Sequence, residues 1–142
     1  MSNPKIPSFI VFLTFAMTTC VFADGYAGNI QVRVLLKTDT TALGRAVEYP
    51  DVASPEVTAI EVTIPPGAET GWHRHSVPWY AYVVAGSLEL EVEGGVRVAL
   101  KAGQAYAELV GVRHNGRNTG NDTVKLVAFF TGEKGKPFTI RE

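Results

Sequence analysis

Apolar and polar side chains alternate in two short segments near the middle of the chain. In residues 87–93, SLELEVE, leucine and valine alternate with serine and glutamate, and residues 96–100, VRVAL, repeat the pattern. Successive side chains of a β-strand point to opposite faces, so this pattern is typical of half-buried strands. Gly94 and Gly95 separate the two segments. Glycines accommodate the positive φ that tight hairpin turns require, so the pattern predicts a β-hairpin.

Other short segments are rich in β-branched and aromatic residues, and turn-forming residues separate them. They are NIQVRVLLK (29–37), EVTAIEVTI (56–64), QAYAEL (104–109) and TVKLVAFF (123–130). After residue 23, no stretch keeps a helical period over three turns. A length of 142 residues with 46% hydrophobic residues suits one core. The sequence therefore predicts a single all-β domain, either a sandwich or a barrel.

The first 23 residues differ from the rest of the chain. They contain one charged side chain, Lys5, and then the apolar run FIVFLTFAM at residues 9–17. That run is too short to span a bilayer, which needs about 20 apolar residues. A basic start, a short apolar run and small residues ending at Ala23 are the parts of a secretory signal peptide. We expect residues 1–23 to be this signal and the protein to be secreted or periplasmic. A buried N-terminal helix or strand is the alternative.

Cleavage after Ala23 removes Cys20, which is the only cysteine. A lipidated Cys20 is a weaker alternative, because threonines precede it where lipoprotein signals have small residues. The remaining residues, 24–142, then form neither disulfides nor thiolate sites. Removing Lys5 leaves 13 − 1 = 12 basic and 14 acidic side chains, a net charge of −2. This balance argues against binding to nucleic acid or, after signal cleavage, to an anionic membrane.

Three histidines, His73, His75 and His114, are the candidate chemistry of the chain. His73 and His75 are two residues apart, so on a strand both point to one face. His114 follows a glycine-containing turn about forty positions later. Three imidazoles from two segments of a barrel are suitable ligands for a divalent transition metal ion. The His-x-His pair alone is a weak signal, and taken by itself it favours histidines that form ordinary hydrogen bonds.

The surroundings of the first pair favour the metal site. Gly67 is followed after five residues by His73 and His75, then after three residues by Trp79 and after six more by Gly86. This spacing resembles motif one of the cupin superfamily, which reads G-x5-H-x-H-x3,4-E-x6-G. Trp79 takes the place of the glutamate, which is the usual carboxylate ligand.

A second stretch resembles cupin motif two, which reads G-x5-P-x-G-x2-H-x3-N. Here the matching positions are Gly103, Leu109, Gly111, His114 and Asn118. Leucine replaces the proline, which we expect to cost little beyond a less rigid turn. Motif one covers residues 67–86 and motif two residues 103–118, with the predicted hairpin between them. Eight of the ten marked positions match.

The resemblance implies a cupin jelly-roll β-barrel over residues 24–142, with His73, His75 and His114 as metal ligands. It implies one divalent ion, which the sequence does not identify among Fe, Zn, Cu, Ni and Mn. Motif alignment places Trp79 on the metal side of the barrel, in the pocket. Glu108 shares a strand face with Tyr106, and it is a second pocket candidate if that face points inward. It would then act as a fourth ligand, as an acceptor for an imidazole N–H or as a general base. The alternative is a solvent-facing carboxylate.

The first functional expectation is a metal-dependent enzyme that acts on a small organic molecule. Cupins with three histidine ligands include oxygenases, so a dioxygenase reaction is the first one to test. The alternative is a periplasmic protein that binds a metal or small ligand without turnover, and a third hypothesis is a purely structural barrel. The resemblance also suggests a homodimer.

Overall fold

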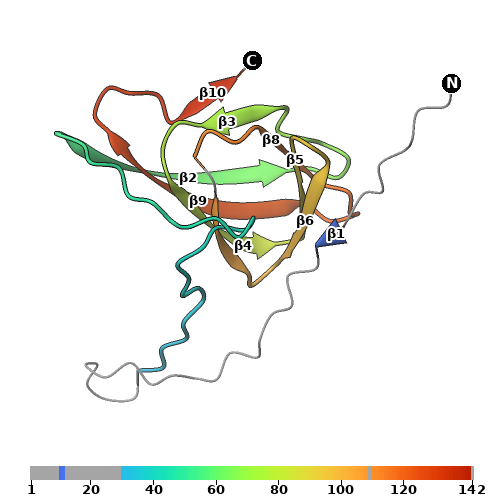
Figure 1. Ribbon diagram of the computed structural model, residues 1–142. Coiled ribbons are helices and arrows are strands. Elements are labelled where there is room, and N and C mark those ends of the chain that lie inside the picture. Colours follow the sequence, from blue (N-terminus) through green and yellow to red (C-terminus); the bar gives the residue numbers. More distant parts are fainter. Residues whose placement is uncertain (1–9, 12–29, 109, 142) are drawn as a thin grey trace, which may run out of the picture.

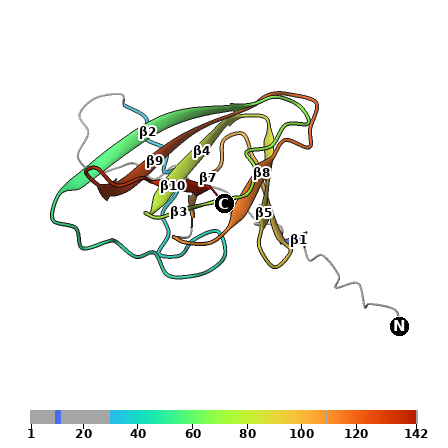
Figure 2. The same cartoon turned by 90° about the horizontal axis from the view of Figure 1, so that it is seen from above.

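Ten strands in two facing sheets form the described part of the chain (Figure 1). The structure is a computed structural model that describes residues 10–11, 30–108 and 110–141. One sheet has, in spatial order, β1 (Ile10–Val11), β6 (Val96–Lys101), β5 (Ser87–Val92), β8 (His114–Arg117), β3 (His73–His75) and β10 (Thr139–Arg141). The other has β2 (Pro55–Ile64), β9 (Val124–Glu133), β4 (Trp79–Ala85) and β7 (Ala105–Glu108). Figure 2 shows the two sheets from above, with β2, β9 and β4 following one another.

The all-β prediction is confirmed, because the described residues contain strands, turns and loops but no helix. It follows that no helix in this part of the chain is long and apolar enough to cross a membrane. Neighbouring strands are antiparallel except β1 and β6. Two facing antiparallel sheets agree with the predicted jelly roll.

The predicted hairpin is present as β5 and β6. Leu90 lies opposite Val98, and the two glycines of the turn have φ values of 92° and 88°. These strands bury every second side chain, as the alternation predicted: Leu88, Leu90 and Val92 are buried, and so are Val98 and Leu100. The buried side chains of the two sheets meet between them and form a single apolar core. The core therefore lies between the sheets and extends to the histidine cluster.

Gly86, at the end of motif one, lies where the two sheets approach closely. Its φ is +78°, which L-residues rarely adopt. A Cβ atom there would lie 2.9 Å from both the Thr123 carbonyl oxygen and the Val124 Cα atom. The position therefore requires glycine for two independent reasons, backbone conformation and space.

The prediction of a strand at residues 29–37 is wrong for its described part, residues 30–37. Residues 30–37 run as an irregular segment outside the two sheets, and no strand is assigned to them (Figure 1). A segment with alternating apolar residues forms a strand only where a neighbouring strand supplies backbone hydrogen bonds. The predicted signal peptide, residues 1–23, lies outside the described residues except for Ile10 and Val11.

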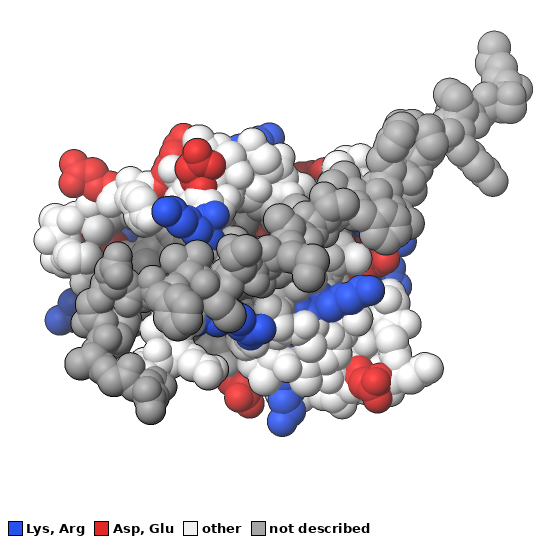
Figure 3. All heavy atoms as spheres, turned by 90° about the horizontal axis from the view of Figure 1, so that it is seen from below, with Lys and Arg blue, Asp and Glu red and all other residues white. Residues whose placement is uncertain are grey.

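Charged side chains are mixed in sign over the visible surface. On the face seen from below, lysine and arginine are interspersed with aspartate and glutamate among uncharged residues (Figure 3). This distribution agrees with the net charge of −1 for the whole chain.

Candidate metal centre

The three histidines lie on two neighbouring strands of the six-stranded sheet. His73 of β3 is directly opposite His114 of β8, and His75 follows two residues later on the same face of β3. The ring centroids are 4.5 Å apart for His73 and His114, 5.0 Å for His73 and His75, and 5.1 Å for His75 and His114. His75 and His114 are buried and His73 is half-buried. The structure therefore brings the three predicted ligands together.

Each imidazole uses Nδ1 in the same way. The Nδ1 distances are 2.7 Å from His73 to the Gly71 carbonyl oxygen, 3.2 Å from His75 to that of Phe138 and 2.9 Å from His114 to that of Val112. A carbonyl oxygen only accepts hydrogen bonds, so these contacts favour the tautomer with a proton on Nδ1. The Nδ1 atom of His75 also lies 3.1 Å from the Thr139 hydroxyl oxygen, which can accept the same proton. In a neutral ring with this tautomer, the lone pair is on Nε2. A backbone carbonyl that fixes the tautomer in this way is a common feature of histidine metal ligands.

Burial keeps two of the imidazoles neutral. The pKa of His75 is lowered to about 3, chiefly by burial and then by the neighbouring His114 and His73. Burial also lowers the pKa of His114 to about 4, against an opposing effect of its hydrogen bond to Val112. Both rings are therefore unprotonated at neutral pH. This is the state that a metal ligand requires.

The spacing of the cluster is compatible with one ion. The ligand atoms of the three histidines lie within 4.8 Å of one another. Two nitrogens bound to a tetrahedral ion, with bonds near 2.1 Å, are about 3.4 Å apart. To bind one ion, the ligand nitrogens would therefore have to approach one another by at most about 1.4 Å. No Asp, Glu or Cys of the described residues belongs to this group. Three neutral nitrogens would leave coordination positions open and would suit first-row transition metals better than calcium or magnesium.

A cavity of about 210 Å³ adjoins the cluster, between the two sheets. The three histidines form part of its wall, and Thr70, Thr139 and Arg141 add polar groups. Most of the remaining lining is aliphatic or aromatic and includes Ile60, Val62, Leu88, Leu90, Leu126 and Phe130. The site thus combines a few polar groups with a largely apolar wall, as small-molecule sites commonly do.

Comparison with known proteins identifies the family. The cupin domain family model matches residues 60–130, which is half of the chain and includes all three histidines. The chain belongs to the cupin superfamily. It is also 43% identical over 88 residues to the β-alanine degradation protein BauB of Pseudomonas aeruginosa, covering 58% of this chain and 90% of that protein.

Solved structures show the same fold at lower sequence identity. A Klebsiella pneumoniae protein with a double-stranded β-helix domain has a TM-score of 0.52 and 20% identity, over 64% of this cupin and 86% of that chain. The DMSP lyase DddQ of Ruegeria pomeroyi has a TM-score of 0.52 and 21% identity, over 59% of this cupin and 42% of the lyase. At these identities the likeness concerns the fold alone.

Trp79 lies in the wall of the cavity beside the histidines. Its ring centroid is 4.7 Å from that of His75, and it stacks on Phe130 at 5.4 Å with an interplanar angle of 8°. At the position of the usual cupin carboxylate, this chain therefore presents an aromatic ring to the histidines. The indole N–H is buried, and no described residue accepts a hydrogen bond from it.

Tyr106 of β7 is a cavity residue to which sequence analysis gave no role. It is 2% exposed, it lines the cavity, and no described residue forms a hydrogen bond with its hydroxyl group. Burial, with a smaller effect of Glu108, raises the pKa of this hydroxyl well above its usual value, so it stays protonated. Alternation along β7 puts the side chains of Tyr106 and Glu108 on the same face, but it does not show whether that face points inward. The partner strand shows it, because inward-facing Trp79 lies opposite Glu108.

Glu108 is buried, but it is not among the residues that line the histidine cavity. It lines a second hollow of about 170 Å³, together with Arg45, Glu48 and Tyr80 among others. The structure therefore does not bring Glu108 into the cluster with the histidines. A coordinating or proton-transferring role for Glu108 stays a prediction.

Proposed function

We propose that this cupin holds one divalent transition metal ion on His73, His75 and His114 and uses it as an enzyme on a small organic molecule. The observation that carries the proposal is the convergence of three imidazoles on an apolar cavity, with ligand atoms within 4.8 Å of one another and each Nδ1 beside a backbone carbonyl oxygen. When bound, such an ion supplies Lewis-acid or redox chemistry. A dioxygenase reaction remains the first to test.

The cavity limits the size of the substrate. An apolar cavity of about 150 Å³ accepts a benzene-sized molecule, so about 210 Å³ suits a molecule somewhat larger. Aliphatic and aromatic side chains of both sheets would exclude water from around it. Thr139 and Arg141 of β10 supply polar contacts at one part of the wall.

Two buried donors indicate the polarity of the substrate. The indole N–H of Trp79 and the hydroxyl group of Tyr106 have no acceptor among the described residues, and both side chains line the cavity. A buried donor without a partner costs about 1 to 3 kcal/mol, so a ligand that supplies acceptors is favoured. We therefore propose a substrate with a carbonyl or carboxylate oxygen, oriented by Trp79 and Tyr106 beside the histidines.

The relative that is 43% identical to this chain supports a small metabolite as the proposed substrate. Its name assigns it to β-alanine degradation. Small carbonyl and carboxylate compounds of the size of β-alanine and its oxidation products therefore belong in the first substrate panel.

Location is part of the same proposal. The three parts of a signal peptide in residues 1–23 support secretion or export to the periplasm. Amino-terminal sequencing of protein from the extracellular or periplasmic fraction of a bacterial host should give a chain that begins at Asp24. A chain retained in the cytoplasm with Met1 intact would contradict this part.

A metal-binding or ligand-binding protein without turnover is the second candidate. The observation in its favour is that no aspartate or glutamate of the described residues lines the cavity. The site then contains no carboxylate general base, and proton transfer would depend on imidazole or solvent.

One set of measurements separates the two candidates. Protein reconstituted with Fe(II), Mn(II), Ni(II), Cu(II) or Zn(II) is mixed with a panel of small diketones, phenols, thiols and carboxylates. Oxygen uptake and product formation are followed by electrode and mass spectrometry. Product that appears with wild type and is lost in Tyr106→Phe supports an enzyme in which the Tyr106 hydroxyl group donates a hydrogen bond to the substrate. A ligand that raises the melting temperature but is recovered unchanged, with every metal, supports the binding protein instead.

A further inference from the structure

We propose that Arg141 determines the specificity of the histidine cavity by binding the carboxylate group of an anionic substrate. The substrate is then a short carboxylic acid with a second oxygen function, which Trp79 and Tyr106 hold beside the histidines. This inference rests on the proposed function and deepens it, because it names the charge of the substrate and the residue that selects it.

β10 places Arg141 in one row with two of the histidines. Arg141 pairs with His73 across β10 and β3, which lie side by side in Figure 1, and His73 pairs with His114 across β3 and β8. Side chains of directly opposite residues point to the same face of a sheet. In the next row, Thr139 Oγ1 lies 3.1 Å from His75 Nδ1, which shows this common face directly. Arg141 accordingly lines the cavity from the strand next to His73.

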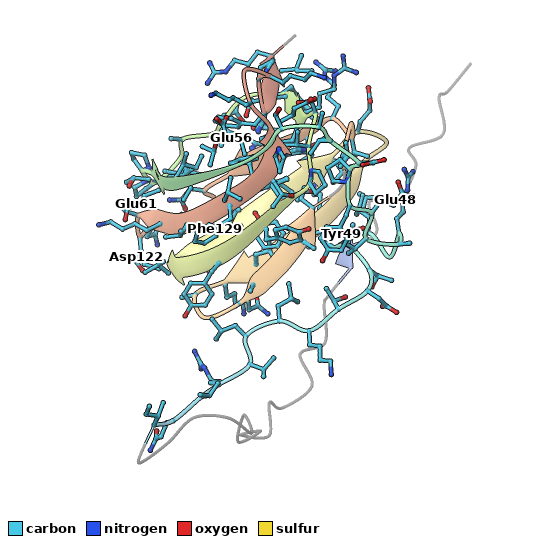
Figure 4. All side chains as sticks on the ribbon, turned by 90° about the vertical axis from the view of Figure 1, so that its left-hand side faces the viewer. Glu48, Tyr49, Glu56, Glu61, Asp122 and Phe129 are labelled. Carbon is cyan, nitrogen blue, oxygen red and sulfur yellow. The ribbon has the colours of Figure 1, made fainter. Side chains whose placement is uncertain are left out.

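No carboxylate of the described residues compensates the charge of Arg141. Other arginines on or beside the six-stranded sheet form ion pairs with glutamates: Arg97, Arg113 and Arg117. None of the ion pairs among the described residues includes Arg141, and none of their aspartates or glutamates lines the cavity. Glu61 of β2 lies instead on the outer face of the four-stranded sheet, on the same side as Phe129 (Figure 4). A guanidinium group without a protein anion is available to a ligand carboxylate, whose two oxygens match its parallel N–H groups.

An ion on the three histidines increases the preference for an anion. The imidazole ligands are neutral, so they leave the double positive charge of the ion uncompensated, and Arg141 adds a further positive charge on the strand next to His73. Like charges repel each other more strongly beside an apolar wall than in water. A ligand carboxylate is attracted by both cations and relieves this repulsion. The cavity should therefore select an anion over a neutral molecule of the same shape.

Burial gives the cavity an open side and a deep side. Arg141 is exposed and His73 is half-buried, whereas Trp79 is 6% exposed and Tyr106 is 2% exposed. A carboxylate at Arg141 stays near solvent, so its binding costs less dehydration than burial at the deep side would. The buried N–H of Trp79 and hydroxyl of Tyr106, which have no acceptor among the described residues, then face the inner end of the ligand. That inner end supplies the second oxygen, as a hydroxyl, carbonyl or further carboxyl group.

Calorimetric titration with two matched ligands tests the selection of charge. 3-Hydroxypropionate and its neutral amide, 3-hydroxypropionamide, share a carbon chain and a hydroxyl group but differ in charge. Each is titrated into metal-free protein and into protein loaded with Zn(II), an ion without redox chemistry. In both forms, wild type should bind the acid more tightly than the amide, by about tenfold or more with zinc. Arg141→Gln should weaken binding of the acid about tenfold and leave binding of the amide unchanged.

Two further variants serve as controls. Arg141→Lys keeps the positive charge but not the parallel N–H groups, so it should retain part of the affinity for the acid. Arg97→Gln removes the same charge from the outer face of the six-stranded sheet, where Arg97 pairs with Glu89 and Glu91. It should bind the acid as wild type does. Circular dichroism checks that each variant keeps the β-fold.

The zinc content of every sample separates this inference from the proposed function. A wild type that holds no zinc contradicts the metal centre, whereas the titrations of the metal-free protein still decide the role of Arg141. Three results would overturn the proposal: wild type that binds the acid no more tightly than the amide or binds neither, unchanged acid binding in Arg141→Gln, or an equal loss in Arg97→Gln. An Arg141→Gln variant that keeps its zinc and loses affinity for the acid alone would support it.

Discussion

Acidification should destabilise the metal-free protein through two buried histidines. The pKa is lowered to about 3 for His75 and to about 4 for His114, compared with about 6.5 in the unfolded chain. Between pH 6.5 and about 4, the unfolded chain therefore binds a proton at each of these histidines, whereas the folded chain does not. The state that binds more protons is favoured as the pH falls, so the free energy of unfolding decreases with acidification.

The size of the effect follows from the two sites together. Each proton bound only by the unfolded chain contributes about 1.4 kcal/mol per pH unit. The unfolded histidines are only about three-quarters protonated at pH 6, so the pair contributes about 2.4 kcal/mol between pH 6 and pH 5. Stabilities of small domains are 5 to 15 kcal/mol, so a large fraction is lost. Urea denaturation of chelator-treated protein at pH 7, 6 and 5, followed by tryptophan fluorescence, measures the loss.

A histidine variant separates this effect from the titration of surface carboxylates. His114→Asn removes one of the two titrating groups and keeps a polar side chain of similar length. Between pH 6 and pH 5, the variant should lose less unfolding free energy than wild type. The difference should be about half of the loss that the two histidines cause in wild type. An equal pH dependence in wild type and His114→Asn would show that His114 is not held neutral by burial.

Three further predictions concern the framework of the site. Gly86→Ala should lower the free energy of unfolding by about 2 to 5 kcal/mol, but Gly95→Ala, with positive φ and open space, by only about 1 to 2. Equal denaturation midpoints would contradict the close contact at Gly86. Asn118→Ala removes three hydrogen bonds to backbone groups and should cost about 2 to 4 kcal/mol in the same assay. Trp79→Glu should raise metal affinity about tenfold in calorimetric titrations and cost about 3 kcal/mol of stability. Unchanged affinity would show that this position does not face the ion.

The strands near the site were predictable because their pattern is local. Alternation in SLELEVE and VRVAL and the glycine pair between them determine a hairpin without reference to the rest of the chain. Local alternation placed only His73 and His75 on one face. The resemblance to the two cupin motifs implied that His114 joins them, and the pairing of β3 with β8 brings it opposite His73. Trp79 followed from its motif position.

The remaining features depend on tertiary contacts. Tyr106 and Glu108 share a face, but only pairing with β4 determines that this face points inward. The burial of Glu108 away from the histidine cavity depends on packing near residues 41–48, which no local pattern encodes. Residues 30–37 have the composition of a strand, yet a strand also requires a partner edge. In the described part of the chain, no strand pairs with them.

Metal content is the most direct test of the central claim, that the three histidines bind one ion. Protein purified without chelator and supplied with first-row divalent ions is analysed by inductively coupled plasma mass spectrometry, next to His73→Ala, His75→Ala and Glu108→Gln. We predict about one ion per chain in wild type and Glu108→Gln, and a loss of about tenfold or more in each histidine variant. A wild type that retains no ion, or histidine variants that retain as much as wild type, would contradict the claim.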